Sequence, residues 1–370
     1  MVKALLPSGA DHRAIPEITP QKCPVETVQF VLTFATIGRE IRRGGLSLLP
    51  AVKSQAPRRQ RTPWAMLLVI VILLAATGFH HQAQVKLVQR ELTISTPAKL
   101  PAPATVAMPA GAAATKLPFP IGENSGVLWN VTTGQLLWQD NPHLKEPLAS
   151  TTKLMTIYLI LHSLPLTQRV TISPLAAGTS GSDIRMAVDN HFTVRQLLYA
   201  LMLRSANDSA VALAQTEAGS VGAFVKKMNE TAHTLGMAQT SYGDPDGLSP
   251  QSSGSAWDLS LIARLDMQNP LFRQIVHTKR TSLPYNPIVT NLNGLLYMDP
   301  SVIGIKTGWT GAAGFNLVFA ATRPVNGTPV TVLGVIMHGQ NGFPPEYQDA
   351  ENILNWAYSR LKSGSTTTRK

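Results

Sequence analysis

An uncharged apolar segment divides this chain of 370 residues into two parts. Residues 64–79, "WAMLLVIVILLAATGF", form a run of sixteen residues without a single charge. A helix at the core of a folded domain usually keeps one polar face, and this run has none. It is slightly shorter than the roughly 20 residues that span a bilayer, but flanking residues can extend it. We therefore predict a transmembrane anchor over residues 64–80.

The distribution of charge predicts the orientation of this anchor in the membrane. The net charge is +11, and residues 1–116 hold 14 Lys and Arg against five Asp and Glu, whereas the rest of the chain holds 18 against 16. Because the basic residues precede the apolar run, the N-terminus is expected to stay inside the cell. The sequence predicts a single-pass protein of the cell membrane with its folded domain outside, or a secreted protein if a signal peptidase cleaves near Ala76-Thr77-Gly78. Nucleic-acid binding is not expected, since the basic region lies across the membrane from the folded domain.

Composition predicts how the remaining chain is organised. Residues 1–63 are basic and Pro-punctuated, and residues 81–120 are rich in Pro and Ala, as in an extended, semi-rigid linker. A folded domain is predicted over residues 121–363, followed by a flexible tail over residues 364–370. The single cysteine, Cys23, excludes an internal disulfide and a Cys-based zinc site. The nine histidines include no H-E-x-x-H spacing, so we expect no metal and no cofactor.

Hydrophobic periodicity predicts both strands and helices in the folded domain. "GVLWNVTTGQLLWQ" predicts two strands about a Thr133-Gly134 turn. "TVRQLLYALML" predicts a helix that opens on a capping box formed by Thr193 and Gln196. Further helices are predicted at "SVGAFVKKMNETAHTLGM", "SAWDLSLIARL" and "PEYQDAENILNWAYSRL", and apolar strands at "GFNLVFAATR" and "PVTVLGVIMHG". The strands thus occupy both ends of the domain, with helices between them.

One predicted helix begins with an unusual pair of polar residues. In "LASTTKLMTIYLIL", Ser150 and Lys153 stand at the head of an otherwise apolar run. A serine hydroxyl is a poor nucleophile until a base takes its proton. A lysine three residues later lies on the same helix face, and desolvation lowers its pKa so that the neutral amine can act as that base. On this motif alone, an N-cap serine beside a lysine that extends to solvent explains the pair equally well.

Two further motifs strengthen the catalytic interpretation. Ser205-Ala206-Asn207 follows a predicted helix directly, and Lys306-Thr307-Gly308 is predicted at the head of an apolar strand. Each has an ordinary structural explanation, a helix cap for the first and a strand start for the second. In this order, S-x-x-K, S-x-N and K-T-G form the motif set of the active-serine, penicillin-recognising enzymes.

The region from about residue 122 to residue 361 resembles the D-alanyl-D-alanine carboxypeptidase family of low-molecular-mass penicillin-binding proteins. "LASTTKLMT", "TVRQLLYALMLRSANDSAVALA", "GDPDGLS", "NLNGLL" and "GIKTGWTGAAGFNLVFAATR" resemble family blocks in family order. The resemblance implies an α+β, DD-peptidase/β-lactamase-like fold, in which an antiparallel sheet flanked by helices lies beside a helical lobe. It also implies a peptidoglycan stem peptide ending in D-Ala-D-Ala as the substrate and β-lactams as inhibitors.

The resemblance implies catalytic roles for four residues. Ser150 would attack the carbonyl between the two D-alanines, and Lys153 would accept its proton. Ser205 would relay a proton to the departing D-alanine. Asn207 would bind the substrate amide and orient Lys153.

The third motif is expected to bind substrate. Lys306 and Thr307 would face the terminal carboxylate, and Gly308 would allow the strand to approach closely. The backbone N–H groups of Ser150 and Trp309 would form the oxyanion hole. Family members often have histidine at position 309, so Trp309 is expected to alter the pH profile or the substrate preference rather than the backbone role.

Three alternatives differ in their agreement with the sequence. A D-alanyl endopeptidase of the same family fits as well as a carboxypeptidase. A class A β-lactamase needs a glutamate in an E-x-x-L-N context, and no acidic residue from Glu217 to Asp299 has one. A non-catalytic wall-binding protein would not need all of the motif residues, which are intact.

Overall fold

The structure, a computed structural model, describes residues 116–364. The predicted N-terminal tail, the anchor and nearly all of the linker lie outside the described residues, as do residues 365–370 of the C-terminal tail. In the part of the chain that is described, no helix combines the length and the apolar character needed to cross a membrane.

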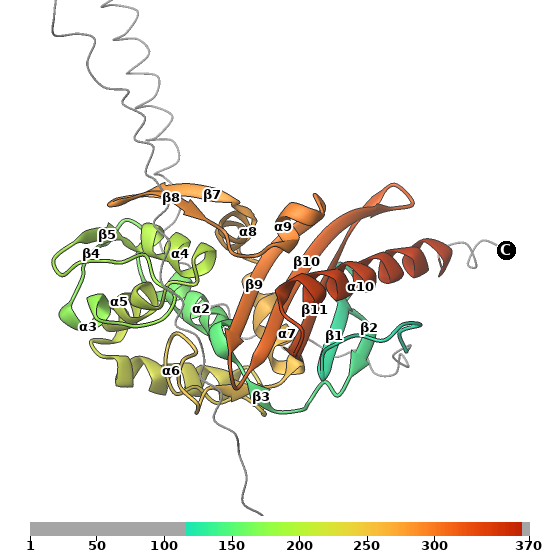
Figure 1. Cartoon of the computed structure of the whole chain (residues 1–370), viewed down its shortest axis with the longest axis horizontal. Coiled ribbons are helices and arrows are strands. Elements are labelled where there is room, and N and C mark those ends of the chain that lie inside the picture. Colours follow the sequence, from blue (N-terminus) through green and yellow to red (C-terminus); the bar gives the residue numbers. More distant parts are fainter. Residues whose placement is uncertain (1–115, 365–370) are drawn as a thin grey trace, which may run out of the picture. The chain divides into compact units, whose positions relative to one another are not determined.

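A five-stranded antiparallel sheet forms one half of the domain (Figure 1). The strand order is β2–β1–β11–β10–β9, so that the first and last strands of the domain pair with each other. Gly134, at φ +77°, allows the tight turn of the predicted first hairpin. The strands are β1 (Ser125–Asn130), β2 (Gln135–Asp140), β9 (Val302–Thr310), β10 (Gly314–Val325) and β11 (Thr328–Gly339).

The sheet is buried on both faces. Helix α7 (Ala256–Asp266) covers one face, where the Trp129 indole donates to Ser260 Oγ at 3.0 Å. Helix α10 (Phe343–Gly364) covers the other face and packs against Leu128 and its neighbours. Successive side chains of a strand point to opposite faces, so a strand between two helices must be apolar at nearly every position. This explains the continuous apolar runs in the sequence.

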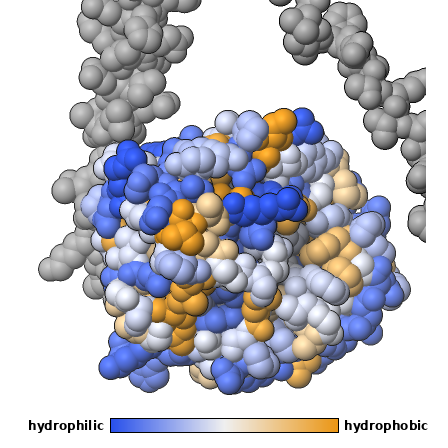
Figure 2. Space-filling model, turned by 60° about the vertical axis from the view of Figure 1, so that its left-hand side comes forward, coloured by the Kyte–Doolittle hydropathy of each residue, from blue (hydrophilic) through white to orange (hydrophobic). Residues whose placement is uncertain are grey.

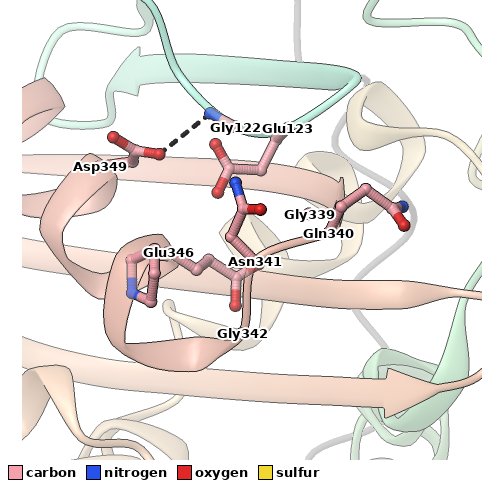
Figure 3. A pocket seen from close by; sticks show the side chains of 9 residues that line it. Gly122, Glu123, Gly339, Gln340, Asn341, Gly342, Glu346 and Asp349 are labelled. Atoms are coloured by element: carbon pink, nitrogen blue, oxygen red, sulfur yellow. Dashed lines mark hydrogen bonds between the residues drawn. The ribbon is translucent and has the colours of Figure 1, made fainter.

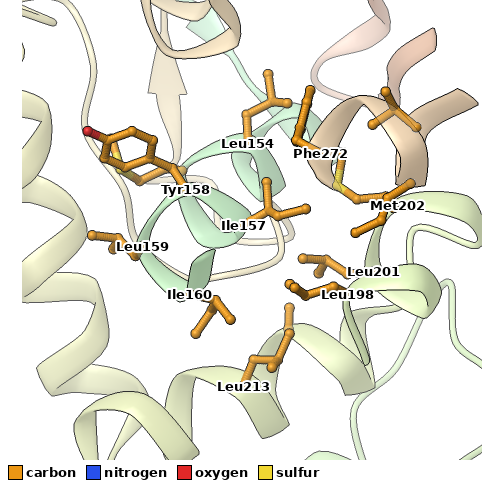
Figure 4. Packing of buried hydrophobic residues seen from close by; sticks show 14 of the residues in the cluster. Leu154, Ile157, Tyr158, Leu159, Ile160, Leu198, Leu201, Met202, Leu213 and Phe272 are labelled. Atoms are coloured by element: carbon orange, nitrogen blue, oxygen red, sulfur yellow. The ribbon is translucent and has the colours of Figure 1, made fainter. Parts of the chain in front are cut away.

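The helical lobe is built around α2 (Lys153–Ser163). Every residue from Lys153 to Ile160 is buried, because α2 packs against helices on several sides (Figure 4). The neighbouring helices of the lobe are α4 (Val194–Leu203), α5 (Asn207–Ala218) and α6 (Val221–Thr234), and α7 and α8 (Pro270–His277) also pack nearby. Truncating a core leucine or isoleucine of α2 to alanine should cost about 2–5 kcal/mol. The first predicted motif therefore lies at the start of a fully buried stretch of α2.

The predicted long elements are confirmed, with differences at their ends. The capping box of Thr193 and Gln196 is present as predicted. Helix α6 ends at Thr234, three residues before the predicted end at Met237. The placement of Lys306-Thr307-Gly308 at the head of an apolar strand is wrong, because these residues lie within β9, the strand before the long apolar one. β10 and β11 give long apolar runs that are easily recognised in the sequence. β9 gives a shorter signal, because only its middle is continuously buried.

Several short elements gave no periodic signal long enough to detect. They are the two-stranded pairs β3 (Glu146–Pro147) with β6 (Ser253–Gly254), β4 (Arg169–Thr171) with β5 (His191–Thr193) and β7 (Arg280–Leu283) with β8 (Asn286–Thr290), the helices α3 (Pro174–Ala177) and α9 (Leu295–Met298), and a 3₁₀ turn, η1 (Ala149–Thr152). On the face shown in Figure 2, hydrophobic side chains form separate patches among polar ones.

Candidate active site

Ser150 lies in η1, a single 3₁₀ turn that leads directly into α2. The prediction that Ser150 and Lys153 share one continuous helix is therefore corrected, since the pair straddles a junction between two helix types. The explanation of Ser150 as an N-cap is wrong, because neither cap position of this segment is Ser150. Ala149 has φ +47°, a left-handed conformation that a non-glycine residue adopts only at a cost. The backbone immediately before Ser150 is thus held in a strained form.

Lys153 forms hydrogen bonds with three separate segments of the chain. Its side chain is fully buried, and its Nζ donates to Ser150 Oγ at 2.9 Å, to Asn207 Oδ1 at 2.7 Å and to the backbone oxygen of Asp246 at 2.6 Å. An ammonium group has three N–H donors, and each has an acceptor here. The contact with Ser150 is within the range that direct proton transfer requires.

Burial favours the neutral form of the Lys153 amine. Burial lowers the pKa of Lys153 from 10.5 to about 8, while the charges of Asp246, Asp244 and Asp208 partly oppose that shift. A group with a pKa near 8 is roughly one-tenth neutral at pH 7, on the order of 300 times more than a group with a pKa of 10.5. The chain therefore keeps a usable fraction of Lys153 in the form that accepts a proton.

Asn207 is the first residue of α5 and is fixed on both sides. Its Nδ2 donates to the backbone oxygen of Ser180 at 2.8 Å, so its Oδ1 must face Lys153. The next residue, Asp208, is buried and accepts two backbone N–H bonds from residues 184 and 186 of the same loop. These bonds tie the loop to the start of α5 and set the orientation of the Asn207 amide.

Ser205 lies nearby without joining this network. It follows the C-terminus of α4, has φ +58° and is 5% exposed. Its hydroxyl has no hydrogen-bond partner among the described residues. The structure thus joins Ser150, Lys153 and Asn207 by direct hydrogen bonds, and leaves the Ser205 hydroxyl unpaired two residues before Asn207.

The third motif lies in β9, next to Ser150. Lys306 is buried, donates to the backbone oxygen of Thr307 at 2.7 Å, and has a pKa well below its usual value because of burial and, to a lesser extent, the charge of Lys153. A Cβ added at Gly308 would lie 3.1 Å from the backbone nitrogen of Ser150, so only glycine allows this approach comfortably. Trp309, the next residue, is 56% exposed.

Two positioning residues were not predicted individually. A Cβ on Gly247, which has φ +92°, would lie 1.8 Å from the backbone oxygen of Ala149. Asn316 is fully buried in β10, and its Nδ2 donates to the backbone oxygens of Pro147 and Leu148 at 3.0 and 3.1 Å. Gly247 belongs to the family block "GDPDGLS", and Asn316 is a polar residue just before the apolar run of β10. Both signals were readable in the sequence, but neither indicated its contact partner.

Within residues 116–364, no group of three or more His, Cys, Asp and Glu side chains is arranged to hold a metal ion. The polar side chains that converge on Ser150 are an amine and an amide. Such a set suits proton transfer and nucleophilic attack.

The model of the D-alanyl-D-alanine carboxypeptidase family, peptidase family S11, matches residues 112–340. The chain belongs to this family. As an S11 peptidase it carries all three predicted motifs within the matched region, and the predicted fold class and DD-peptidase function are confirmed.

The S11 relatives include proteins with two different names. The chain is 33% identical over 209 residues to the D-alanyl-D-alanine carboxypeptidase DacF of Bacillus subtilis, covering 54% of this chain and 54% of DacF, about half the length of that relative. It is 32% identical over 277 residues to the D-alanyl-D-alanine endopeptidase of Pseudomonas aeruginosa, covering 72% of this chain and 86% of that protein. The crystal structure of the D-alanyl-D-alanine carboxypeptidase of Mycobacterium tuberculosis H37Rv matches with a TM-score of 0.62 and 29% identity, over 68% of this chain and 96% of the other.

Proposed function

We propose that this S11 peptidase is a serine D-Ala-D-Ala carboxypeptidase, which removes the terminal D-alanine from peptidoglycan stem peptides and is acylated by β-lactams at Ser150. The observation that most supports the proposal is the 2.9 Å contact between Lys153 Nζ and Ser150 Oγ, combined with a Lys153 pKa of about 8. It provides the activated serine that an acyl-enzyme mechanism needs.

The family resemblance supports the following sequence of steps. The Ser150 oxygen attacks the carbonyl between the two D-alanines as its proton passes to Lys153. The negative oxygen of the tetrahedral intermediate accepts from the backbone N–H groups of Ser150 and Trp309. On collapse, the C–N bond breaks, and the leaving nitrogen receives a proton from Lys153 by way of the Ser205 hydroxyl. Water then repeats the attack on the ester, releases the shortened stem peptide and restores Ser150.

Substrate recognition in this proposal depends on Lys306. Among residues 116–364, its ammonium has one acceptor, whereas that of Lys153 has three. A carboxylate of the terminal D-alanine would supply a charged acceptor and restore the lowered pKa of Lys306. The domain is proposed to act outside the cell, tethered by residues 64–80, and this topology rests on the charge distribution of the sequence.

The nucleophile can be tested by intact-mass analysis after incubation with penicillin. We expect the wild type to gain one covalent adduct, and Ser150→Ala to gain none while keeping its melting temperature. Ser363→Ala, at the distant end of α10, provides a matched control that should be acylated normally. An adduct mapped to Ser205 would contradict the proposed roles.

An endopeptidase activity on D-alanyl cross-links is the second candidate, because the P. aeruginosa relative carries that name. Three substrates separate the two activities: a diacetyl-Lys-D-Ala-D-Ala peptide, its C-terminal amide and a cross-linked muropeptide dimer. A carboxypeptidase that uses Lys306 should lose roughly ten- to a hundredfold in kcat/KM on the amide, since a charge-assisted hydrogen bond contributes about 1.5–3 kcal/mol. Faster cleavage of the dimer than of the free acid would favour the endopeptidase.

A further inference from the structure

Large apolar side chains are exposed together along the edge of the domain that β7, β8, α8 and α9 form (Figure 1). Half of the exposed large hydrophobic residues in the described part of the chain lie between residues 285 and 298. They are Tyr285, Ile288, Leu292, Tyr297 and Met298, with exposed fractions from 43% to 72%. Soluble surfaces usually scatter such residues singly, so this group indicates a contact surface.

The pairing of the β7–β8 hairpin explains why Ile288 is its most exposed apolar residue. Leu283 and Val289 are buried on the inner face, and successive side chains of a strand alternate between faces. Ile288 therefore points outward. Arg280 pairs with Thr290, two residues along β8 from Ile288, so Arg280 and Ile288 share the outer face.

Contacts at the base of the hairpin join it to α9. The Tyr297 hydroxyl donates to the backbone oxygen of Lys279 at 3.0 Å, and Lys279 Nζ lies 5.4 Å from the centre of the Tyr297 ring. Between hairpin and helix, the Leu292 N–H donates to the backbone oxygen of Leu203, at the end of α4, at 2.9 Å. The outer face of the hairpin and the exposed side of α9 thus form one supported surface, which we call the hairpin face.

The charges of this region have one sign. Residues 267–298 include no Asp or Glu, but they include Arg273, His277, Lys279 and Arg280. Helix α4, which packs against the hairpin, has no acidic residue either. None of these Lys and Arg side chains is paired with a carboxylate of residues 116–364. Exposed tyrosines and aliphatic groups beside unpaired cations are typical of a surface that lies at the headgroup level of an anionic bilayer.

We propose that the hairpin face docks on a membrane surface that contains anionic phospholipids, with Ile288 and Tyr297 among the headgroups and Lys279 and Arg280 near the phosphates. The inference rests on the proposed tether at residues 64–80. As an extended Pro-rich chain, residues 81–115 would reach about 110 Å, against a diameter of roughly 45 Å for a domain of this size. The tether would therefore let any face turn to the bilayer, and the chemistry of the hairpin face selects this one.

Docking by this face would also set the height of the active site. β9 begins at Val302, three residues after the end of α9, and Gly308 lies six residues further along the strand. At the usual rise per residue, this separation is roughly 20 Å. Ser150, next to Gly308, would thus act on stem peptides close to the membrane rather than throughout the wall.

An environment-sensitive dye tests the docking in the full-length protein. Cys23→Ser removes the native thiol, and Ile288→Cys or Leu175→Cys then carries the fluorophore NBD. Leu175, on α3 of the helical lobe, is 57% exposed and serves as the matched control. In vesicles of phosphatidylcholine with phosphatidylglycerol, the emission of the label at position 288 should shift to the blue, and that at position 175 should not. The shift should weaken in vesicles of phosphatidylcholine alone.

The charge contribution is tested in the same labelled protein. Arg280→Gln should lower the docking constant about fivefold, the effect of one basic residue near an anionic surface. Lys226→Gln, on exposed α6, should leave the docking constant unchanged. Both variants should be acylated by penicillin at the wild-type rate, because neither residue belongs to the active site.

The opposite results separate the possible failures. A blue shift at position 288 in detergent without vesicles would mean that another part of the chain or, if the shift depends on protein concentration, a second copy covers this face. Equal shifts at both positions, or no dependence on phosphatidylglycerol, would also overturn the docking. A protein that does not float with the vesicles refutes the tether and the docking together. Loss of penicillin acylation would instead refute the proposed function, whatever the dye reports.

Discussion

Two buried groups of titratable side chains differ in how the chain surrounds them. In the active site, Lys153 is fully buried but donates to three oxygens from three separate segments. In the other cluster, Glu346 of α10 is 1% exposed, and neither carboxyl oxygen has a hydrogen-bond partner among the described residues (Figure 3). Glu123 lies beside it with one oxygen unpaired, and Asp349 accepts from the backbone of Gly122.

The neighbouring groups determine how far burial shifts the pKa of each side chain. The pKa of Lys153 falls to about 8, because burial outweighs the nearby carboxylates, so both protonation states are accessible near neutral pH. Burial and neighbouring acidic groups raise the pKa of Glu346 to about 9 and that of Glu123 to about 8. Because burial and acidic neighbours outweigh any hydrogen bonds they accept, these carboxyls keep their protons at neutral pH. A buried charge thus becomes available for chemistry where the chain supplies polar partners on several sides.

The largest expected effect is on acylation by Lys153→Met. Methionine fills much of the volume of the lysine side chain but cannot accept the Ser150 proton, so the second-order rate of penicillin acylation should fall on the order of 10²- to 10⁴-fold. The domain should remain folded, since an apolar residue of similar volume often replaces a buried charge without loss of stability. Stopped-flow acylation and thermal unfolding measure the two quantities.

Lys226→Met is the matched control for this substitution, because Lys226 is exposed and forms only an exposed pair with Glu230. It should acylate at the wild-type rate. Acylation of Lys153→Met within a fewfold of wild type would mean that another group takes the proton, and the comparison between the two clusters would lose its functional meaning.

A second, smaller effect concerns the pH profile. Because the base must be neutral, kcat/KM should rise with pH through the Lys153 pKa of about 8 in the free enzyme. The charge of Asp246 raises that pKa, so Asp246→Asn should move the rising limb to lower pH while keeping the backbone acceptor. A shift of one pH unit would raise the rate at pH 7 by about fivefold, since the neutral fraction would rise from roughly one-tenth to roughly one-half.

Asp140→Asn, on the exposed end of β2, should leave the limb in place. If Asp246→Asn moved the limb to higher pH, the carboxyl would not be acting as a charge near Lys153. Full pH profiles on one peptide substrate distinguish these outcomes.

The sequence was sufficient to predict the long elements and the three motifs, for identifiable reasons. The apolar periodicity of helix α4 lies within its own sequence, and its capping box is formed by the nearby residues Thr193 and Gln196. The motifs were recognisable because nucleophilic chemistry restricts residue type and order. The apolar runs of β10 and β11, whose two buried faces leave few polar positions, predicted a central sheet. The fold class followed from the family resemblance.

The remaining features depend on contacts between distant residues. Nothing near Ala149 in the sequence indicates its positive φ, which fits the turn at Gly247 almost a hundred residues later. The Glu123–Glu346 cluster joins residues more than 200 positions apart, and in sequence each resembles an ordinary surface acid. Long-range packing of this kind is visible only once the sheet has brought the two ends of the domain together.

The smallest predicted effect concerns the acidic cluster, and its sign depends on pH. The pKa of Glu346 is about 9 in the folded protein against an ordinary value of 4.5, so the unfolded chain releases this proton first as pH rises. Its contribution to stability is fully present below about pH 4.5 and is lost progressively as pH approaches 9. Glu346→Gln keeps the shape without the titrating group, and should unfold at a temperature roughly 2–4 °C above wild type at pH 8, equivalent to about 1 kcal/mol, with little difference at pH 4. Glu230→Gln, which alters an exposed carboxylate, should show neither effect. A Glu346→Gln variant less stable than wild type at pH 8 would mean that the ionised carboxylate has partners in solution, and the contrast with Lys153 would disappear.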